Sequence, residues 1–238
     1  MAQQTLIIEA AEVEVNTACP RRCSYCPNSI PELRDSNHCM SDDLYQRILA
    51  ELGAADYVGR LSFHLYSEPL LRQDLRRLIV LARQALPLTF LVLYTNGDLL
   101  TEARYENLLD AGLDRFIVTR HDDRMLAPRP YQMQLHWKDL ILTSRGGLVA
   151  PARVLNRPCH APTEMLIVAV NGDVLLCHED GRREFVMGNL AKQSLREVWW
   201  SAAFVEKRSL LSQGRRSDVG GLCARCDLTC YTLPGGGM

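Results

Sequence analysis

Three cysteines near the N-terminus, Cys19, Cys23 and Cys26, are spaced C-x3-C-x2-C. A four-iron cluster takes four ligands, usually cysteine thiolates. Because this loop supplies three, the fourth iron would be open to bind and activate a small molecule. Zinc sites usually carry cysteines in C-x2-C pairs and close all four positions, and no fourth ligand follows promptly here. The spacing therefore predicts an iron–sulfur cluster with one open iron.

A second group of cysteines lies in the last third of the chain. Cys159 and Cys177 flank a predicted β-hairpin, Cys223 and Cys226 form a C-x2-C pair, and Cys230 follows. Four of these five thiols could close a complete cluster. A structural zinc knuckle is the alternative for this group.

The composition excludes several classes of partner. The 238 residues carry 27 Lys and Arg against 28 Asp and Glu, so no broad electrostatic field for nucleic acid or membrane is expected. No apolar run reaches bilayer length, and the first eight residues lack the basic segment and the apolar length of a signal peptide. Nine cysteines without an export signal indicate metal ligation in a reducing compartment, so we expect a cytoplasmic protein.

The first 145 residues alternate strand and helix patterns. The strand patterns cover residues 13–16, 61–66, 89–94, 116–119 and 140–142, and the helix patterns cover 42–52, 71–86 and 101–112. This alternation predicts a parallel sheet with functional groups at the carboxyl ends of its strands. The chain is too short for eight βα units. We therefore expect an α/β fold with a truncated, TIM-like barrel of about five parallel strands over residues 1–150.

After Cys159 the pattern changes. Residues 165–170 and 174–177 indicate a small β-hairpin, because Asn171 and Gly172 form the usual two-residue turn. Ser194 and Glu197 form a capping box that opens a helix running towards residue 211. We therefore expect residues 151–238 to form a second, small domain that holds the second cysteine group.

The N-terminal motif resembles that of the radical S-adenosylmethionine (SAM) superfamily. An aromatic residue precedes the third cysteine, residues 66–69 (Tyr-Ser-Glu-Pro) stand where the family carries a Gly-Gly-Glu-Pro-like motif, and residues 94–97 (Tyr-Thr-Asn-Gly) end the next strand. The resemblance implies that the open iron chelates the amino and carboxylate groups of SAM. The residues that it implies around SAM are Tyr25, Tyr66, Ser67, Glu68, Asn96 and Thr119.

The hairpin, helix and C-x2-C layout of residues 151–238 is similar to the twitch domain of radical SAM enzymes, which holds one auxiliary cluster. The resemblance implies a second [4Fe–4S] cluster. The ligands that it implies are Cys159, Cys177, Cys223 and Cys226. For Cys230, three roles stay open: a ligand, a hydrogen-atom donor, or a small buried residue.

Seven segments together resemble the radical SAM dehydrogenases that oxidise aminocyclitols in antibiotic biosynthesis. They are residues 12–16, 25–29, 62–71, 94–98, 116–119, 145–147 and 187–189. The resemblance covers nearly the whole chain and implies oxidation of a secondary alcohol to a ketone on an aminocyclitol or aminoglycoside. It also implies an external electron donor such as flavodoxin or ferredoxin. The chain departs from that family at His178, where the family has an apolar aromatic, and at Cys39 and Cys230, which have no cysteine counterparts.

The same resemblance implies a set of substrate-binding residues: Tyr66, Tyr94, Arg145 and Glu179. A base must take the hydroxyl proton, and His121, His178 and Glu179 titrate more readily than Arg145, whose guanidinium stays protonated. We therefore predict Arg145, Glu179 and His178 as catalytic residues, with Arg145 orienting the hydroxyl and stabilising the alkoxide.

Three alternatives remain at this point. An epimerase would use Cys39 or Cys230 to return a hydrogen atom to the opposite face of the substrate. A peptide-modifying enzyme is disfavoured because the sequence shows no extra N-terminal peptide-binding domain. An iron–sulfur electron carrier is disfavoured by the motifs that resemble SAM contacts.

Overall fold

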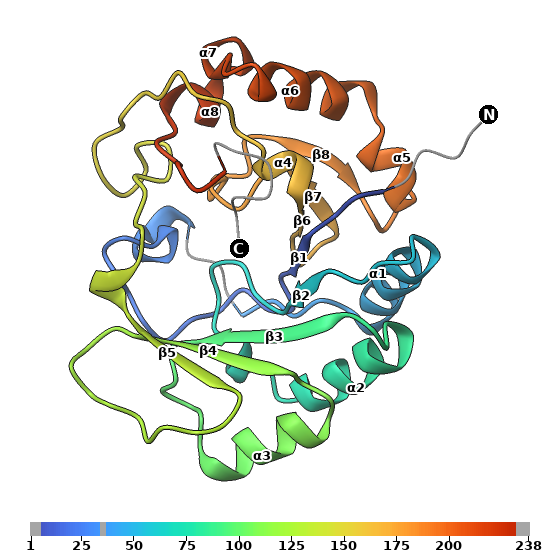
Figure 1. Cartoon of the computed structure of the whole chain (residues 1–238), viewed down its shortest axis with the longest axis vertical. Coiled ribbons are helices and arrows are strands. Elements are labelled where there is room, and N and C mark those ends of the chain that lie inside the picture. The colour runs from blue at the N-terminus through green and yellow to red at the C-terminus, as the bar shows by residue number, and fades with distance from the viewer. Residues whose placement is uncertain (1–5, 34–36, 232–238) are drawn as a thin grey trace.

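An eight-stranded open sheet organises the computed structural model, which describes residues 6–33 and 37–231 (Figure 1). The strands are β1 (Ala10–Val13), β2 (Arg60–Ser62), β3 (Phe90–Thr95), β4 (Arg115–Arg120), β5 (Gln132–His136), β6 (Met165–Val168), β7 (Asp173–Leu175) and β8 (Val186–Asn189). Their order across the sheet is β5-β4-β3-β2-β1-β6-β7-β8. Strands β1 to β6 pair in parallel, and β7 and β8 are added antiparallel.

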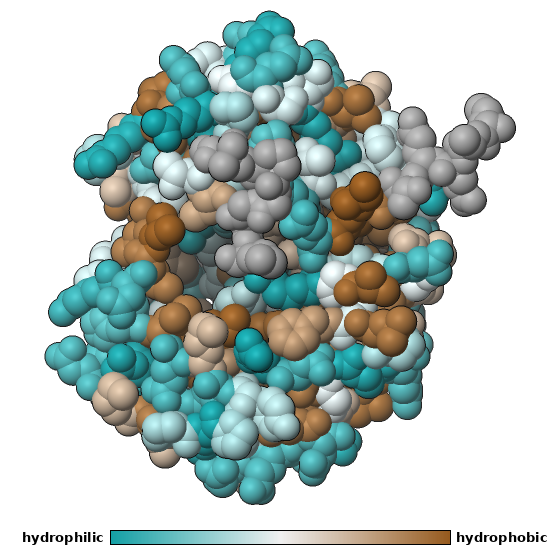
Figure 2. Space-filling model, in the orientation of Figure 1, coloured by the Kyte–Doolittle hydropathy of each residue, from teal (hydrophilic) through white to brown (hydrophobic). Residues whose placement is uncertain are grey.

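The helices fall into two groups at opposite ends of the sheet. They are α1 (Asp42–Ala54), α2 (Leu75–Ala85), α3 (Glu102–Asp110), α4 (Ala161–Glu164), α5 (Leu195–Trp199), α6 (Ala202–Ser212), α7 (Arg216–Val219) and α8 (Gly221–Arg225). In Figure 1, α1 to α3 lie beside β1 to β4, whereas α5 to α8 lie towards β7 and β8. The surface shown in Figure 2 is hollowed between these N-terminal and C-terminal halves.

Local sequence accounts for most of these elements. Ser41 and Thr101 cap α1 and α3, each accepting a hydrogen bond from a backbone N–H of the first turn. Strand β3 is apolar along its length, and its central residues 91–93 are fully buried, as expected for a parallel strand covered on both faces. The polar residues that follow β1, β2 and β3 therefore meet at one edge of the sheet.

The structure corrects several of the expected boundaries. Residues 140–142 form no strand, and the fifth strand is β5, which pairs with β4 in the register Phe116↔Gln132. The strand is short and follows Pro128 and Pro130, which interrupt the sequence pattern, although residues 132–136 do alternate between polar and apolar. The helix expected to run from Ser194 to residue 211 is broken after α5, because Ser201 caps a new helix, α6. Helix α2 begins at Leu75, after a short 3₁₀ turn at Pro69–Leu71.

The expected barrel of about five parallel strands is not confirmed. The parallel part has six strands, because β6 of the predicted hairpin pairs with β1 in the register Ala10↔Met165. The α/β class is confirmed, and the sheet is not closed, since β5 and β8 lie at its two edges. Across residues 6–33 and 37–231, no helix combines the length and the apolar character needed to cross a membrane.

Candidate active site

A cavity of about 380 Å³ opens at the carboxyl ends of the parallel strands. It brings together regions that are far apart in the sequence: the N-terminal cysteine loop, the turns after β2 and β3, the end of β4, the segment before Cys159, and His178. The predicted site residues that line it are Cys19, Cys23, Tyr25, Cys26, Tyr66, Ser67, Glu68, Tyr94, Asn96, Thr119, Arg145 and His178. Glu179 and the four C-terminal cysteines do not line this cavity.

The cysteine loop follows β1 and is only half-buried. The N–H of Cys26 donates to the carbonyl of Cys23 at 2.9 Å, which folds the loop into a tight turn. The Sγ of Cys23 lies 3.4 Å from Nδ1 of His121, and Nδ2 of Asn96 lies 3.9 Å from Sγ of Cys19. Burial raises the pKa of the Cys19 and Cys26 thiols, so the thiolates that bind iron need a neighbouring positive charge. The cationic core of an iron–sulfur cluster would supply that charge, so a cluster fits this set of thiol donors.

One side of the loop is covered by aromatic rings. Tyr25 stacks on Trp137, with ring centroids 5.5 Å apart and planes 13° from parallel, and its hydroxyl contacts His121. Trp137 follows directly after β5 and had no role in the sequence prediction. The sequence pattern indicates a strand at residues 140–142 and not at 132–136, so it does not predict that Trp137 lies next to the cysteine loop.

Glu68 connects the turns after β2 and β3. Its side chain is buried and accepts hydrogen bonds from the N–H of Leu70 at 3.0 Å, the hydroxyl of Thr95 at 2.8 Å and the N–H of Asn96 at 2.8 Å. Burial raises the pKa of this carboxyl, and the three donors oppose the shift. The Glu68 carboxylate therefore holds the backbone of Asn96 in place at the cavity wall.

Three buried polar atoms at the cavity have no partner among the described residues: Oγ of Ser67, Nδ1 of His64 and Nε of Arg145. Buried polar groups are almost always hydrogen-bonded, so orphaned ones at a cavity indicate a missing ligand. Ser67 belongs to the segment that resembles the SAM-contacting motif. The site therefore fits a polar cofactor beside the three thiols.

Arg145, which is half-buried, forms an ion pair with the buried carboxylate of Glu179 beside the cavity. Oε2 of Glu179 accepts from the Thr143 hydroxyl at 2.5 Å, and Nε2 of His178 lies 3.3 Å from Oε1. Burial by itself would raise the pKa of Glu179, but the His178 hydrogen bond and the charge of Arg145 lower it to about 2. The guanidinium also lies over the ring of Tyr66, 5.5 Å from its centroid. Glu179 is thus held as a carboxylate.

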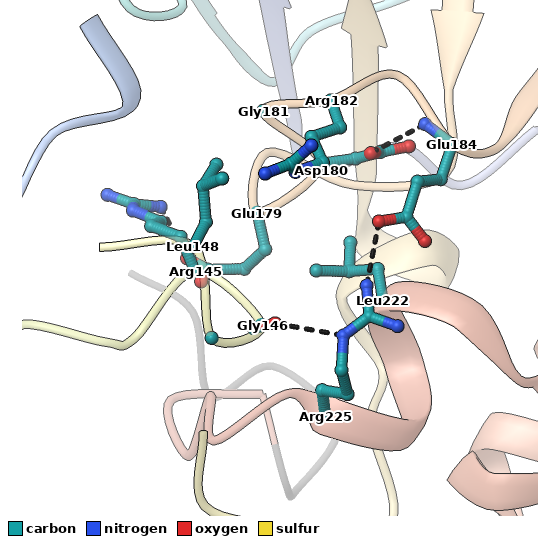
Figure 3. A pocket seen from close by; sticks show the side chains of 11 residues that line it. Arg145, Gly146, Leu148, Glu179, Asp180, Gly181, Arg182, Glu184, Leu222 and Arg225 are labelled. Carbon is teal, nitrogen blue, oxygen red and sulfur yellow. Dashed lines mark hydrogen bonds and ion pairs between the residues drawn. The ribbon is translucent and has the colours of Figure 1, made fainter. Parts of the chain in front are cut away.

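A second cavity of about 270 Å³ lies on the far side of this ion pair and is drawn in Figure 3. Arg145 lines both cavities, and Glu179 lines the second. Nε of Arg225 donates to the carbonyl of Gly146 at 3.1 Å, and its Nη2 pairs with Glu184 at 2.7 Å (Figure 3). Gly146 has φ +62°, and an added Cβ would lie 2.3 Å from Cδ1 of Leu222. Only glycine fits this approach, which fixes the backbone after Arg145.

The four C-terminal cysteines are all buried: Cys159, Cys177, Cys223 and Cys226. Burial, and then the charges of Cys223 and Cys226, raise the pKa of Cys177, so these three thiols are neighbours. Burial and the charge of Cys226 raise the pKa of Cys223 to about 12. Buried thiolates are unstable in a dry site unless cations lie between them. The donor set therefore fits a closed cluster.

All nine cysteines are free thiols, and in the described part of the chain no three His, Cys, Asp or Glu side chains converge on a point that could hold a single metal ion. Cys39 is exposed, and its backbone pairs with that of Asn16 in an isolated antiparallel β-bridge. Cys230 is half-buried and packs against the core. Neither residue lines the two cavities described above.

Comparisons with known proteins agree with this arrangement. Residues 13–121 match the family model described as the radical SAM superfamily, and residues 159–227 match that of an iron–sulfur cluster-binding domain. The chain is 35% identical over 230 residues to the S-adenosyl-L-methionine-dependent 2-deoxy-scyllo-inosamine dehydrogenase of Niallia circulans, covering 91% of each chain. It is 35% identical over 105 residues to the PqqA peptide cyclase of Bradyrhizobium diazoefficiens, covering 44% of this chain and 26% of the relative.

Solved structures give the same result. The crystal structure of BtrN in complex with AdoMet and 2-DOIA has a TM-score of 0.87 and 34% identity, covering 97% of each chain. BtrN in an open conformation has a TM-score of 0.80 and 32% identity, covering 98% of this chain and 96% of that one. The chain belongs to the radical SAM superfamily, as a SAM-dependent dehydrogenase with one [4Fe–4S] cluster in its N-terminal part and an auxiliary cluster in its C-terminal part.

Proposed function

We propose that this enzyme oxidises a secondary alcohol on an aminocyclitol or aminoglycoside to a ketone. The observation that carries the proposal is the position of Arg145 and His178 at the cavity that holds the three N-terminal thiols, with Cys177 next to His178 in the chain. The relative that is 35% identical to this chain is named for dehydrogenation of 2-deoxy-scyllo-inosamine. A substrate in this cavity would therefore lie between the two cysteine groups.

When bound, SAM and the N-terminal cluster supply a 5′-deoxyadenosyl radical that removes hydrogen from the carbinol carbon, and the auxiliary cluster supplies an electron acceptor. The remaining tasks belong to the chain. We assign substrate binding to Tyr66, Tyr94, Arg145 and Glu179. Arg145 orients the hydroxyl and stabilises the negative charge that develops on its oxygen. Its ion pair with Glu179 and its contact with Tyr66 support this role, because they restrict the guanidinium to one direction.

The remaining assignments rest on the same resemblance. Tyr25, Ser67, Glu68, Asn96 and Thr119 form the SAM side of the cavity, and His178 is a candidate for the base. We propose a division of labour between residues 1–150, which carry the radical chemistry in a partial barrel, and residues 151–238, which hold the auxiliary cluster. The enzyme works in the cytoplasm with an external one-electron donor, since nine free thiols suit a reducing compartment.

The experiment is product analysis with an aminocyclitol deuterated at the reacting carbon. We expect deuterium in 5′-deoxyadenosine, a ketone product, and one SAM consumed per product. The control is the enzyme with Cys19, Cys23 and Cys26 replaced by alanine, which should give neither product. Recovery of an inverted alcohol with solvent hydrogen at that carbon would instead identify an epimerase.

A further inference from the structure

Arg216 is an arginine buried next to the auxiliary cysteines. It begins α7, its side chain is 1% exposed, and it is the largest fully buried side chain of the described residues. A guanidinium keeps its positive charge at every pH that proteins tolerate. Within residues 6–33 and 37–231, no carboxylate pairs with it. Arginines this buried almost always have an acidic partner, so this one requires an explanation.

The partners of Arg216 are four backbone carbonyls. Nε donates to the carbonyl of Arg157 at 2.9 Å, and Nη2 donates to those of Pro158 at 3.4 Å and Leu228 at 2.9 Å. Nη1 donates to the carbonyl of Cys226 at 3.1 Å. The first two carbonyls directly precede Cys159, and the other two belong to Cys226 and the turn after it. Arg216 therefore connects the two segments that carry these cysteines.

The same turn supplies a hydrogen bond to sulfur. The N–H of Leu228 lies 3.4 Å from Sγ of Cys226, while the carbonyl of Leu228 accepts from Arg216. The guanidinium therefore holds Leu228, the residue whose N–H donates to a predicted ligand. Net charge, hydrogen bonds to sulfur and solvent exposure set the reduction potential of iron–sulfur clusters. Arg216 adds a positive charge beside the cysteines and holds the residue that donates a hydrogen bond to sulfur. Its buried side chain also occupies space that water would otherwise fill.

The sign of the charge effect follows from electrostatics. A cluster with four thiolate ligands is anionic, and reduction adds one more negative charge. A fixed cation in a dry site stabilises the reduced cluster more than the oxidised one, because the attraction grows with the charge of the cluster. A carboxylate beside Arg216 would cancel this effect. The carbonyls satisfy its N–H groups and leave its net charge in place.

We propose that Arg216 is a positioning residue that raises the reduction potential of the auxiliary cluster through its unpaired buried charge. This inference rests on the proposed function in one respect, the use of that cluster as an electron acceptor. A higher potential makes the cluster a better acceptor for the electron released when the carbinol radical becomes a ketone. The substrate radical is oxidised and the cluster is reduced by one electron, and the hydroxyl proton leaves to a base.

The test measures the potential without substrate. The background is the full chain with Cys19, Cys23 and Cys26 replaced by alanine, so that only the auxiliary cluster is present. In this background Arg216→Gln removes the charge, Arg216→Lys keeps it with fewer hydrogen bonds, and Arg215→Gln is the matched control. Arg215 is the preceding residue, but it is exposed and paired with Asp218 at 2.5 Å. Iron content and a redox titration followed by electron paramagnetic resonance are the two readouts.

In Arg216→Gln, we expect the ratio of reduced to oxidised cluster at a fixed potential to fall at least about tenfold, which corresponds to ~59 mV for a one-electron couple. Arg215→Gln should leave the ratio unchanged because solvent screens that charge. Arg216→Lys should lie closer to the parent than to Arg216→Gln. An unchanged ratio in Arg216→Gln with the iron retained overturns the proposal.

If Arg216→Gln does not fold, Arg216→Lys decides alone. A parental ratio there supports the charge role, and a fallen ratio with the iron retained assigns the effect to hydrogen bonding and overturns the proposal. Because no substrate is present, these outcomes are independent of product analysis. A ketone formed by the intact enzyme, together with an unchanged potential in Arg216→Gln, would reject this inference and leave the proposed function standing.

Discussion

The two cysteine groups of this protein differ in how they are assembled. Cys19, Cys23 and Cys26 come from one loop, are half-buried, and line a cavity of about 380 Å³. In the second group, Cys159 and Cys226 come from segments 67 positions apart in the numbering, and all four of the predicted ligands are buried. A site that binds a cofactor must be accessible to it, and a short loop at a cavity allows this. A cluster that accepts an electron must be shielded from water, and several packed segments provide this together.

Each group also has a nearby arginine, and the two arginines differ in whether a carboxylate balances their charge. Arg145 reaches the cavity and is paired with Glu179, so its charge is largely balanced and its direction is fixed. Among the residues that the structure describes, the partners of Arg216 are backbone carbonyls and no carboxylate pairs with it, so its charge is not balanced there. The first arrangement suits recognition of a neutral hydroxyl, and the second suits stabilisation of an anionic cluster.

The largest expected effect concerns the open site. Replacing Cys19, Cys23 and Cys26 by alanine should abolish SAM cleavage and leave about half of the roughly eight iron atoms of the intact enzyme, because only one of two cubanes is lost. Iron analysis and detection of 5′-deoxyadenosine are the measurements. Cys39→Ala is the control, since Cys39 is exposed and outside the cavity. SAM cleavage that survives the triple substitution would remove the distinction between the two groups.

Substitutions in the closed site should separate SAM cleavage from product formation. Cys226→Ser should lose or distort the auxiliary cluster, retain cleavage of SAM, and form little or no ketone. Cys230→Ser should keep both clusters, because Cys230 is a half-buried residue packed against the core. Iron content and the ratio of ketone to 5′-deoxyadenosine are the measurements. The reverse pattern would show that Cys230, and not Cys226, is a ligand.

Disrupting the ion pair should have a smaller but still strong effect. Arg145→Lys or Glu179→Gln should lower turnover on the order of 100-fold or more, if these groups act in the transition state. A lysine cannot reproduce the forked geometry that faces Glu179. Arg182→Lys is the matched control, because Arg182 lies in the same loop as Glu179 and is exposed. Steady-state kinetics with both clusters verified is the measurement, and equal losses in the control would indicate a general disturbance of the loop.

The smallest expected effect concerns the aromatic cover of the open site. Trp137→Ala should raise the KM for SAM by up to about tenfold, since a stacked aromatic pair contributes about 0.5–1.5 kcal/mol. Trp137→Phe should retain most of the affinity because it can still stack on Tyr25. If alanine and phenylalanine give the same KM, the stacking has no role in cofactor binding.

Much of the site could be predicted from the sequence because its signals are local. The three-cysteine loop, the caps of α1 and α3, and the apolar run of β3 each depend on neighbouring residues. The corresponding predictions are close to the structure. A pattern of this kind survives folding because tertiary contacts reinforce the local preference.

Other features were decided by tertiary structure. Strand β5 pairs along the edge that β4 offers, although it is short and follows a segment that contains two prolines. The C-terminal hairpin joins the same sheet through β6 and β1, which no local pattern predicts. Trp137 acquires its place from β5.

Arg216 shows this difference most clearly. In the sequence it is one of two adjacent arginines after a glycine, a pattern typical of a solvated turn. In the structure Arg215 is exposed and Arg216 is buried beside the auxiliary cysteines. Local preference can predict which residues form a loop or a cap, because the interacting groups are neighbours in the chain. Whether a charged side chain faces water or a cluster depends on which distant segments pack around it, and only the folded chain determines that.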